Sequence, residues 1–419
     1  MLNFNDQSPI KVSIIGQGYV GLPLAVRLST CVKEVIGFDI DAQRVSEILE
    51  GRVRTETISK EDLRQALISG AYRPTTDIED LEGSQIIILA VPTPLTKKGQ
   101  PDYSILLEAT HNIARFVREG VLVISESTAS TGTTRELIAP ILLENGIKFE
   151  DMLLGCAPER IDPSNDNYFL VNTPRIVSGV NEKSTLAVKS FYEKFLTRVQ
   201  VFSSVEIVEA AKLLENSFRL LNISFINEFS EYCNARDLDV YEVIRAASSK
   251  PFGFMAFYPG PGAGGHCIPV DPLYLLEDSK RNGIQLPLLE SAIDSNLRRP
   301  QIILERVREL VKLSPQKRVL IEGITYKQNV ADIRESASIK LAHLLSEAGL
   351  DVKYYDEIYD GEVPRLRRAK NRMGFDLLVL CVAHSKEKIE EYYKLNCPIL
   401  DLTGLLQPAS SENIKIYRA

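Results

Sequence analysis

The chain has 419 residues, of which 44% are hydrophobic and 25% charged, and its formal net charge is −7. This length predicts two or three domains, and the composition is that of a soluble globular protein. The negative balance disfavours nucleic acid and anionic membrane surfaces as partners. No apolar run approaches the roughly 20 residues that a membrane helix needs.

The cysteine pattern argues against both disulfides and metal. The cysteines are far apart, form no Cys-x-x-Cys pair and are accompanied by only four histidines. That spacing fits neither a disulfide framework nor a zinc site, so we expect no metal. The N-terminus lacks a basic region followed by an apolar one, so we predict no secretory signal. A cytoplasmic location follows, and there a thiol is available for chemistry. The six cysteines are residues 31, 156, 233, 267, 381 and 397.

A dinucleotide fingerprint opens the chain. Residues 11–15 have a buried-strand pattern, Gly16, Gly18 and Gly21 follow at G-x-G-x-x-G spacing, and residues 22–28 continue at helical spacing. In such a turn the glycines permit the tight bend, the approach of a pyrophosphate and close helix–strand packing. The pyrophosphate is expected at the helix N-terminus. A purely structural turn is the weaker interpretation.

The next predicted strand, residues 34–39, ends in Asp39 at the spacing of a ribose-binding acid. A carboxylate there accepts hydrogen bonds from the ribose hydroxyls of the cofactor and repels a 2′-phosphate. Its presence therefore favours NAD over NADP. Arg44 lies nearby in the sequence and tempers this preference, since an arginine can accommodate a phosphate.

Further predicted strands alternate with helical stretches, a pattern typical of a parallel, doubly wound α/β sheet. In such sheets ligands bind beyond the carboxyl ends of the strands, where Thr93, Thr128 and Glu159 lie. For any one of them, strand termination or helix capping is the simpler explanation. The strands are expected at residues 85–91, 121–125, 153–157 and 175–179.

Residues 205–236 predict one long helix, in which Lys212 and Asn216 share a face. Taken alone, this pattern favours a solvated lysine beside Glu209 and Glu215. The Gly/Pro-rich segment 260–271 then delivers Cys267 and Asp271, which suits a rigid binding loop around a nucleophile. Taken by itself, the segment favours a structural turn with a buried, inert cysteine, and only the rest of the chain changes that preference.

After a helix at residues 287–312, a second alternating section predicts a smaller doubly wound domain without a glycine fingerprint. Lys327 and Arg334 follow its first strand, where cations suit phosphate oxygens, although plain surface charge is the alternative. We therefore predict an NAD-binding Rossmann domain at 1–203, a central helical domain at 204–312 and a Rossmann-like domain at 313–419.

Seven motifs in this order resemble the UDP-glucose/GDP-mannose dehydrogenase family of nucleotide-sugar 6-dehydrogenases, most closely its UDP-N-acetylhexosamine branch. The resemblance implies two Rossmann-like domains joined by a long central helix, a homodimer or higher homo-oligomer formed through that helix, NAD as cofactor and a UDP-sugar as substrate. The motifs are GQGYVGLPLA (16–25), VPTP (91–94), EST (126–128), PER (158–160), EAAKLLEN (209–216), PGPGAGGHCIPVDP (259–272) and GITYKQNVADIRES (323–336).

The resemblance also assigns roles to individual residues. It makes Cys267 the nucleophile, with Lys212, Asn216, Asp271, Glu159 and Thr128 as further catalytic candidates. The NAD contacts that it implies are Gly16, Gly18, Tyr19, Val20, Gly21, Asp39, Arg44, Thr93, Thr128 and Arg334. The substrate contacts that it implies are Glu159, Arg160, Lys212, Asn216, Phe257, Tyr258, Gly260, Gly264 and Lys327.

The implied reaction is a four-electron oxidation of a sugar C6 hydroxymethyl group to a carboxylate, through a thiohemiacetal and a thioester on Cys267. UDP-N-acetylglucosamine is the favoured substrate, with its manno and galacto epimers and UDP-glucose as alternatives. A two-electron dehydrogenase of the 3-hydroxy acid or phosphogluconate type and a non-catalytic sugar-nucleotide sensor are the other hypotheses.

Overall fold

The computed structural model describes residues 10–52, 58–162, 165, 167–384, 389–406 and 414–418. The first nine residues, which carry part of the prediction that no secretory signal is present, lie outside this set. The chain divides into two compact units, residues 1–215 with 273–284 and residues 216–272 with 285–419. The three domain boundaries expected from the sequence stay a prediction.

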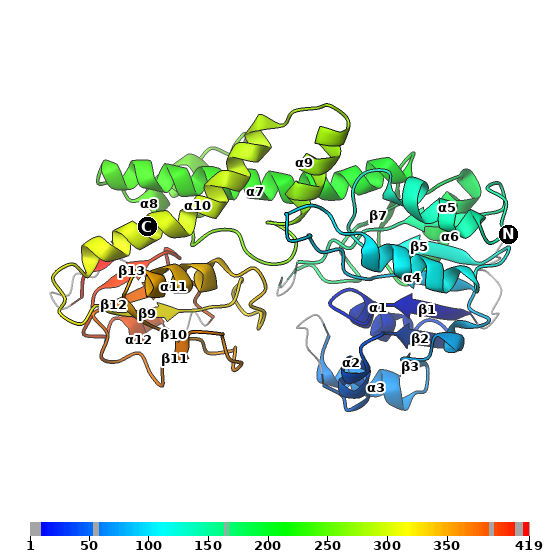
Figure 1. Ribbon diagram of the computed structural model, residues 1–419, viewed down its shortest axis with the longest axis horizontal. Coiled ribbons are helices and arrows are strands. Elements are labelled where there is room, and N and C mark those ends of the chain that lie inside the picture. Colours follow the sequence, from blue (N-terminus) through cyan, green and yellow to red (C-terminus); the bar gives the residue numbers. More distant parts are fainter. Residues whose placement is uncertain are drawn as a thin grey trace. The chain divides into compact units, whose positions relative to one another are not determined.

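The first unit, most of which is drawn in blue and cyan in Figure 1, is built on a sheet of eight described strands in the order β3-β2-β1-β4-β5-β6-β7-β8. The first six positions have the 3-2-1-4-5-6 order of a Rossmann fold. The strands are β1 (Lys11–Ile15), β2 (Glu34–Phe38), β3 (Tyr72–Thr75), β4 (Ile86–Leu89), β5 (Leu122–Ser125), β6 (Leu153–Cys156), β7 (Arg175–Gly179) and β8 (Val199–Val201).

Helices cover both faces of this sheet. Side chains of β1 and β4 alternate between two apolar cores, with Val12 and Ile86 in one and Ile15 and Ile87 in the other. Helices α1 and α6 pack into the first core, and α4 and α5 pack into the second. This is the doubly wound α/β arrangement predicted from the sequence. The helices of the unit are α1 (Gly21–Leu28), α2 (Ala42–Leu49), α3 (Lys60–Ile68), α4 (Ser104–Ala114), α5 (Ala139–Leu143) and α6 (Glu182–Tyr192), with single turns η1 (Ile78–Leu81) and η2 (Thr134–Ile138).

The prediction of parallel strands is wrong at one point. Strand β7 runs antiparallel to β6, with Gly155 opposite Gly179. A parallel neighbour needs a crossover, usually helical, and the described part of the connection between these strands contains no helix. Strands β3 and β8 were not predicted at all, because both are short and have no extended apolar run.

The second unit carries a sheet of six described strands in the order β11-β10-β9-β12-β13-β14, all parallel. This repeats the strand order of the Rossmann fold, as expected for the second alternating section. Apolar cores lie on both faces, around Ile321 on one and Leu320 on the other. Its elements are β9 (Arg318–Glu322), α11 (Ala337–Glu347), β10 (Asp351–Tyr355), β11 (Arg367–Arg368), β12 (Leu377–Leu380), α12 (Ile389–Tyr392), β13 (Ile399–Asp401) and β14 (Ile416–Arg418).

The described residues also form four further helices: α7 (Val205–Ala235), α8 (Val240–Ser248), α9 (Asp271–Arg281) and α10 (Pro287–Leu310). The long helix α7, drawn in green in Figure 1, agrees with the prediction to within one residue at its C-terminal end. Both α7 and α9 run from one unit into the other. None of the helices in the described part of the chain has the length and apolar character required to span a membrane.

Candidate active site

The glycine turn after β1 has the shape that a dinucleotide requires. A Cβ on Gly21 would lie 1.8 Å from the carbonyl oxygen of Gly16, so only glycine allows α1 to start this close to the strand. A Cβ on Gly18 would meet no atom within 4 Å, which leaves space beside the backbone there. No side chain caps the first turn of α1, whose N-cap is Val20. An anion therefore fits against this helix N-terminus.

Asp39 stands at the end of β2 beside this turn. Its carboxylate accepts a hydrogen bond of 2.8 Å from the backbone N–H of Gln17, while its side chain remains 13% exposed. The Arg44 guanidinium donates to the carbonyl of Gln17 at 3.2 Å and lies 4.0 Å from the Asp39 carboxylate, and its role as an NAD contact stays a prediction. This arrangement suits ribose hydroxyls and NAD.

A second ligand edge lies after β4 and β5, where the structure brings Thr93 and Thr128 together. The Thr93 hydroxyl donates to the carbonyl of Thr128 at 2.7 Å. The Tyr274 hydroxyl, from α9, donates to the carbonyl of Thr93 at 2.7 Å. Tyr274 also packs edge-on against Tyr103, whose hydroxyl bonds Ser130 at 2.6 Å. Nothing in the local sequence pattern pointed to these two tyrosines as supports of the predicted NAD contacts.

Lys212 and Glu159 meet in the first unit, but not through the glutamate side chain. The Lys212 ammonium, 9% exposed, donates to the backbone carbonyl of Glu159 at 2.7 Å. The Glu159 carboxylate is taken up by the backbone N–H groups of Arg160 and Ile161 and by the Arg175 guanidinium, at 2.5–2.7 Å. These contacts suit a residue that orients Lys212. The role of Glu159 in handling water and protons stays a prediction.

Behind Glu159 lies a buried charge cluster that the sequence did not reveal. Arg175, on β7, contacts the carboxylates of both Glu126 and Glu159, and the Tyr192 hydroxyl donates to Glu126. Burial raises the pKa of Glu126 to about 7. Although burial acts in the same direction on Glu159, the Arg175 charge and the two N–H donors hold its pKa below the usual value. One guanidinium thus fixes the backbone on which Lys212 rests.

Glu209 ties α7 to the segment that follows Thr128. Its buried carboxylate accepts hydrogen bonds from the N–H of Gly132 and from the N–H and hydroxyl of Thr134, at 2.6–2.8 Å. Burial nevertheless raises the pKa of Glu209 to about 7, against the effect of these donors. The first turns of α7 are therefore anchored to the predicted NAD edge by one carboxyl group.

Replacing Glu209 with alanine should lower the free energy of unfolding by about 3 kcal/mol, because buried donors lose their acceptor. The stabilisation from this group is fully present below pH 4.5, its ordinary pKa, and is lost as the pH rises through about 7. Urea unfolding at pH 6 and pH 8 should therefore give a larger difference at pH 6. The matched control is Glu206→Ala, one turn earlier on α7, where loss of a half-buried ion pair with Arg135 should cost less than about 1 kcal/mol. Equal losses in the two variants would contradict the anchoring role.

Cys267 lies in the second unit, in the turn that leads into α9. The six cysteines form no disulfide; four are buried, Cys31 is exposed and Cys267 is half-buried. Burial raises the pKa of Cys381 to about 12 and that of Cys397 to about 11, which keeps those thiols inert. Cys267 is therefore the thiol that combines a ligand-type loop with access to solvent.

Asn216 and Asp271 meet next to this turn. The Asn216 amide donates to the Asp271 carboxylate, and the N–H of Asp271 donates to the Cys267 carbonyl at 2.8 Å. Both side chains are at least 93% buried. Asn216 lies four residues after Lys212 on α7, so the two side chains share a helix face. The structure thus connects the cysteine turn to the helix face that sequence reasoning singled out.

The second unit also contains a cavity of about 250 Å³ at the carboxyl end of β9. Lys327 contributes to its wall, together with Pro261 and Gly262 of the Gly/Pro segment. The other lining residues are Thr325, Tyr326, Gln328, Ala337, Ser338, Cys381, Val382, Ala383, Thr403 and Leu405. A cavity at this edge of a Rossmann-like sheet is where a nucleotide is expected.

The remaining predicted contacts have the following surroundings. The Arg334 side chain pairs with Asp332 at 2.6 Å and contacts His266. Arg160 pairs with Glu215 of α7. Phe257 packs edge-on against Phe218, and Tyr258 stacks on Tyr241. The N–H of Gly260 donates to the Asn227 side chain. A Cβ on Gly264 would lie 2.9 Å from the carbonyl oxygen of Glu335. Their roles toward NAD or substrate stay predictions.

A Rossmann unit with an NAD-type acid, together with a second unit that carries a cavity of about 250 Å³ and a half-buried thiol, has the features of an NAD-dependent dehydrogenase. Comparison with known families gives the particular kind. Models of the UDP-glucose/GDP-mannose dehydrogenase family match in three parts: the NAD binding domain at residues 10–196, the central domain at 206–298 and the UDP binding domain at 320–407. The chain belongs to this family and is an NAD-dependent nucleotide-sugar 6-dehydrogenase.

Several curated relatives are similar over nearly the whole chain. UDP-N-acetyl-D-glucosamine 6-dehydrogenase of Pseudomonas aeruginosa is 32% identical over 425 residues, covering 96% of this chain and 99% of the relative. UDP-N-acetyl-D-mannosamine dehydrogenase of Methanocaldococcus jannaschii is 32% identical over 386 residues, covering 90% and 86%. Among solved structures, the UDP-D-ManNAc dehydrogenase of Pyrococcus horikoshii has a TM-score of 0.86 at 29% identity, covering 97% of this chain and 99% of that one.

Proposed function

We propose that this enzyme oxidises the C6 hydroxymethyl group of a UDP-N-acetylhexosamine to the carboxylate, with UDP-N-acetylglucosamine as the favoured sugar. The observation that carries the proposal is the Asn216–Asp271 hydrogen bond, which links the Cys267 turn to the α7 face bearing Lys212. Relatives named for N-acetylglucosamine, N-acetylmannosamine and N-acetylgalactosaminuronic acid support an N-acetylhexosamine over glucose.

NAD⁺ supplies the acceptor for each of the two hydrides that the reaction releases. The glycine turn after β1 and Asp39 would hold it, for the reasons given above. Thr93 and Thr128, tied together and braced by Tyr274, would form the edge nearest the reacting ring.

Cys267 would act between the two oxidations. Its thiolate adds to the aldehyde formed in the first, and the resulting thiohemiacetal is oxidised to a thioester. Water then attacks the acyl carbon and the thiolate leaves, so one water is consumed and the carboxylate is released. Sulfur suits both roles, because it is a good nucleophile and a good leaving group.

Lys212 and Asn216 would stabilise the oxyanions of the addition and hydrolysis steps, as one ammonium and one amide donor. The carbonyl of Glu159 and the carboxylate of Asp271 orient these two donors. Asp271 is then a candidate for holding the attacking water. Lys327, Phe257, Tyr258, Gly260, Gly264 and Arg160 are the proposed substrate contacts.

A panel of UDP-N-acetylglucosamine, UDP-N-acetylmannosamine, UDP-N-acetylgalactosamine and UDP-glucose would test the proposal through the absorbance of NADH. We expect the highest kcat/KM with an N-acetylated sugar and two NADH formed for each uronate. One NADH per substrate would indicate a two-electron dehydrogenase. A preference for UDP-glucose would overturn the N-acetylhexosamine assignment.

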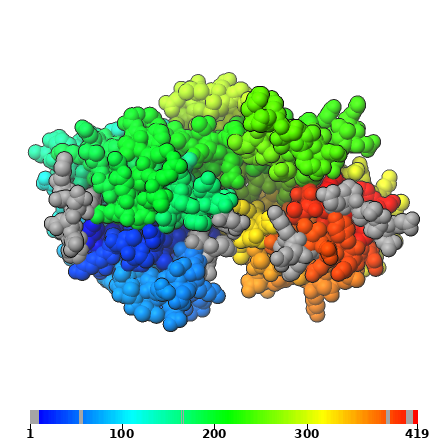
Figure 2. All heavy atoms as spheres, turned by 180° about the vertical axis from the view of Figure 1, so that it is seen from behind, coloured from blue at the N-terminus to red at the C-terminus, as the bar shows by residue number. Residues whose placement is uncertain are grey.

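We also propose a homodimer or higher oligomer formed through α7. Apolar side chains at spacings of four and seven make an exposed stripe along this helix, and Figure 2 shows the α7 region, in green, at the surface. The stripe is Ile207, Leu214, Phe218, Phe225 and Tyr232, each at least 44% exposed. A solution mass equal to the 46.9 kDa chain would exclude an oligomer.

We also propose a cytoplasmic location for the enzyme. The six cysteines form no disulfide, which fits that location, and cell fractionation would test it.

A further inference from the structure

The second Rossmann-like sheet repeats the glycine turn of the first, with an acid at the same place. After β9, the N–H of Gly323 donates to the carbonyl of Tyr355 at 2.9 Å, and the N–H of Ile324 donates to the Asp356 carboxylate at 2.8 Å. The turn after β1 makes the same two bonds, with Asp39 as the acid. Asp356 thus stands where the first unit keeps its ribose-type carboxylate.

Unlike Asp39, however, Asp356 is closed off from ligands. Its side chain has no solvent exposure, against 13% for Asp39. Its oxygens accept the backbone N–H groups of Ile324, Ile358 and Tyr359 at 2.8–3.0 Å. Burial acts to raise its pKa, but contact with His384 and these donors outweigh burial and lower it, so the carboxylate stays charged. Asp356 is therefore a buried hydrogen-bond acceptor that holds the turn after β9 in place, and not an acceptor for ribose hydroxyls.

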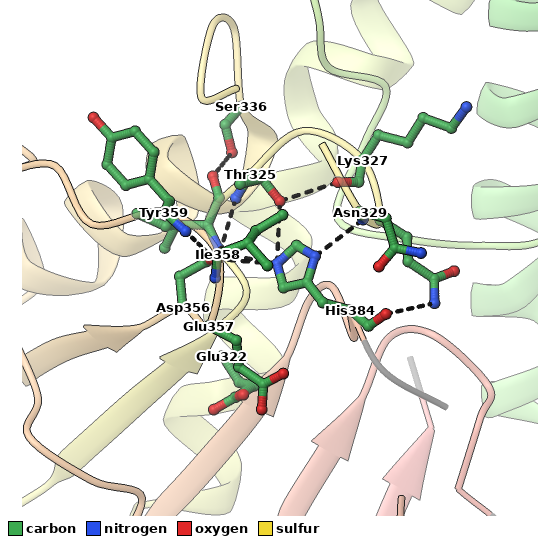
Figure 3. Close-up of polar contacts among 12 residues, drawn as sticks. Glu322, Thr325, Lys327, Asn329, Ser336, Asp356, Glu357, Ile358, Tyr359 and His384 are labelled. Atoms are coloured by element: carbon green, nitrogen blue, oxygen red, sulfur yellow. Dashed lines mark hydrogen bonds and ion pairs between the residues drawn. The ribbon is translucent and has the colours of Figure 1, made fainter. Parts of the chain in front are cut away.

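His384 also holds this turn, through contacts with Asp356 and with residues of the turn itself (Figure 3). The backbone N–H of Asn329 points at its Nδ1 at 3.1 Å, and since an N–H can only donate, Nδ1 must accept. The ring proton then lies on Nε2, which faces Asp356 Oδ2 at 3.2 Å and Thr325 Oγ1 at 3.4 Å. The His384 carbonyl accepts from the Gln328 side chain at 3.4 Å. One side chain thus bonds both ends of the turn 324–329.

This turn forms one wall of the cavity in the second unit. Thr325, Lys327 and Gln328 line the cavity, whereas His384 and Asp356 are not among its lining residues. The Thr325 hydroxyl donates to the Lys327 carbonyl at 3.1 Å, so the contacts of His384 reach the backbone that carries the lysine.

We propose that His384, acting with Asp356, is a positioning residue for the sugar nucleotide: it fixes the turn 324–329 in the conformation that presents Lys327 to a uridine diphosphate group. The inference rests on the proposed function for the identity of the ligand. The fastening of the turn itself does not depend on it.

Two near-isosteric substitutions in the full-length enzyme separate positioning from general stability. In His384→Asn the amide oxygen can replace Nδ1 as acceptor for the Asn329 N–H, whereas His384→Gln puts its amide at the Nε2 position and leaves that donor unsatisfied. Asp356→Asn removes the carboxylate charge that His384 contacts, while His384 itself stays in place. His111→Ala, at an exposed histidine on α4, is the control.

Three readouts are needed: hydrogen exchange of the peptide covering residues 323–330, the Kd for UDP by calorimetry, and kcat with separate KM values for the UDP-sugar and NAD⁺. We expect His384→Gln and Asp356→Asn to speed exchange in that peptide and to raise the UDP Kd and the sugar KM about tenfold. The KM for NAD⁺ should stay within about twofold, and His384→Asn should lie closer to wild type.

If hydrogen exchange in the peptide 323–330 were unchanged in His384→Gln and Asp356→Asn, the claim that these two residues hold the turn 324–329 would be wrong. Faster exchange with an unchanged UDP Kd would overturn the link to the ligand, as would equal rises in the KM for sugar and for NAD⁺. Failure of the proposed function is distinguishable: the wild-type enzyme would then neither bind UDP nor reduce NAD⁺ with any sugar of the panel, and the exchange result would still decide whether His384 holds the turn.

Discussion

Alanine at position 267 should abolish uronate formation, with a loss of at least about 10³-fold in the rate of carboxylate release. Without the thiol no thiohemiacetal forms, so the aldehyde has no covalent route to the second oxidation. The first oxidation should persist, because it does not use sulfur. Product analysis by mass spectrometry, with NADH followed in the same reaction, would therefore find at most one NADH per sugar.

Serine at the same position gives a sharper result. A hydroxyl can add to the aldehyde and be carried on to an ester. An alkoxide is a poorer leaving group than a thiolate, so the ester should hydrolyse slowly and an acylated enzyme should accumulate. Intact-protein mass spectrometry would detect it. The matched control is Cys31→Ala, because Cys31 is the other solvent-reachable thiol. Uronate released at the wild-type rate by the alanine variant at 267 would remove Cys267 from the mechanism.

Replacing Lys212 with methionine should lower kcat by about 10²–10³-fold, the usual loss when one oxyanion donor is removed. The side chain keeps its length and apolar stem but loses its charge and its hydrogen bond to the Glu159 carbonyl. Because the proposed NAD site is the glycine turn of the first unit, the KM for NAD⁺ should change little. Initial rates with saturating NAD⁺ and varied sugar nucleotide would measure the effect.

Lys189→Met is the matched control, since Lys189 lies on helix α6, half-exposed, with only an ion pair to Glu193. It should leave kcat unchanged, because exposed ion pairs contribute little. A Lys212→Met enzyme that keeps more than a tenth of the wild-type kcat would show that its ammonium does not stabilise the reacting oxygen.

Local pattern predicted most of the elements and singled out candidate residues for the chemistry. The alternation of strand and helix predicted both sheets, and the stretch without glycine or proline predicted α7 to within one residue. The glycine fingerprint and Asp39 predicted the NAD edge, because a tight turn and an acid after the next strand are local requirements. Family resemblance then added roles to Cys267 and Lys212 that spacing alone left open.

Only the tertiary structure decided which groups support these residues. Arg175 bridges two carboxylates from other strands, Tyr274 reaches Thr93 across 181 positions of sequence, and His384 meets Asn329 across 55. Such contacts arise where strand ends and loops converge, and each partner taken alone looks like an ordinary buried or surface residue. The antiparallel direction of β7 likewise accompanies a connection in whose described residues there is no helix. Sequence by itself therefore determined most of the elements and the candidate reactive groups, whereas folding decided which groups support them, because hydrogen-bond partners far apart in sequence are chosen by packing and not by local periodicity.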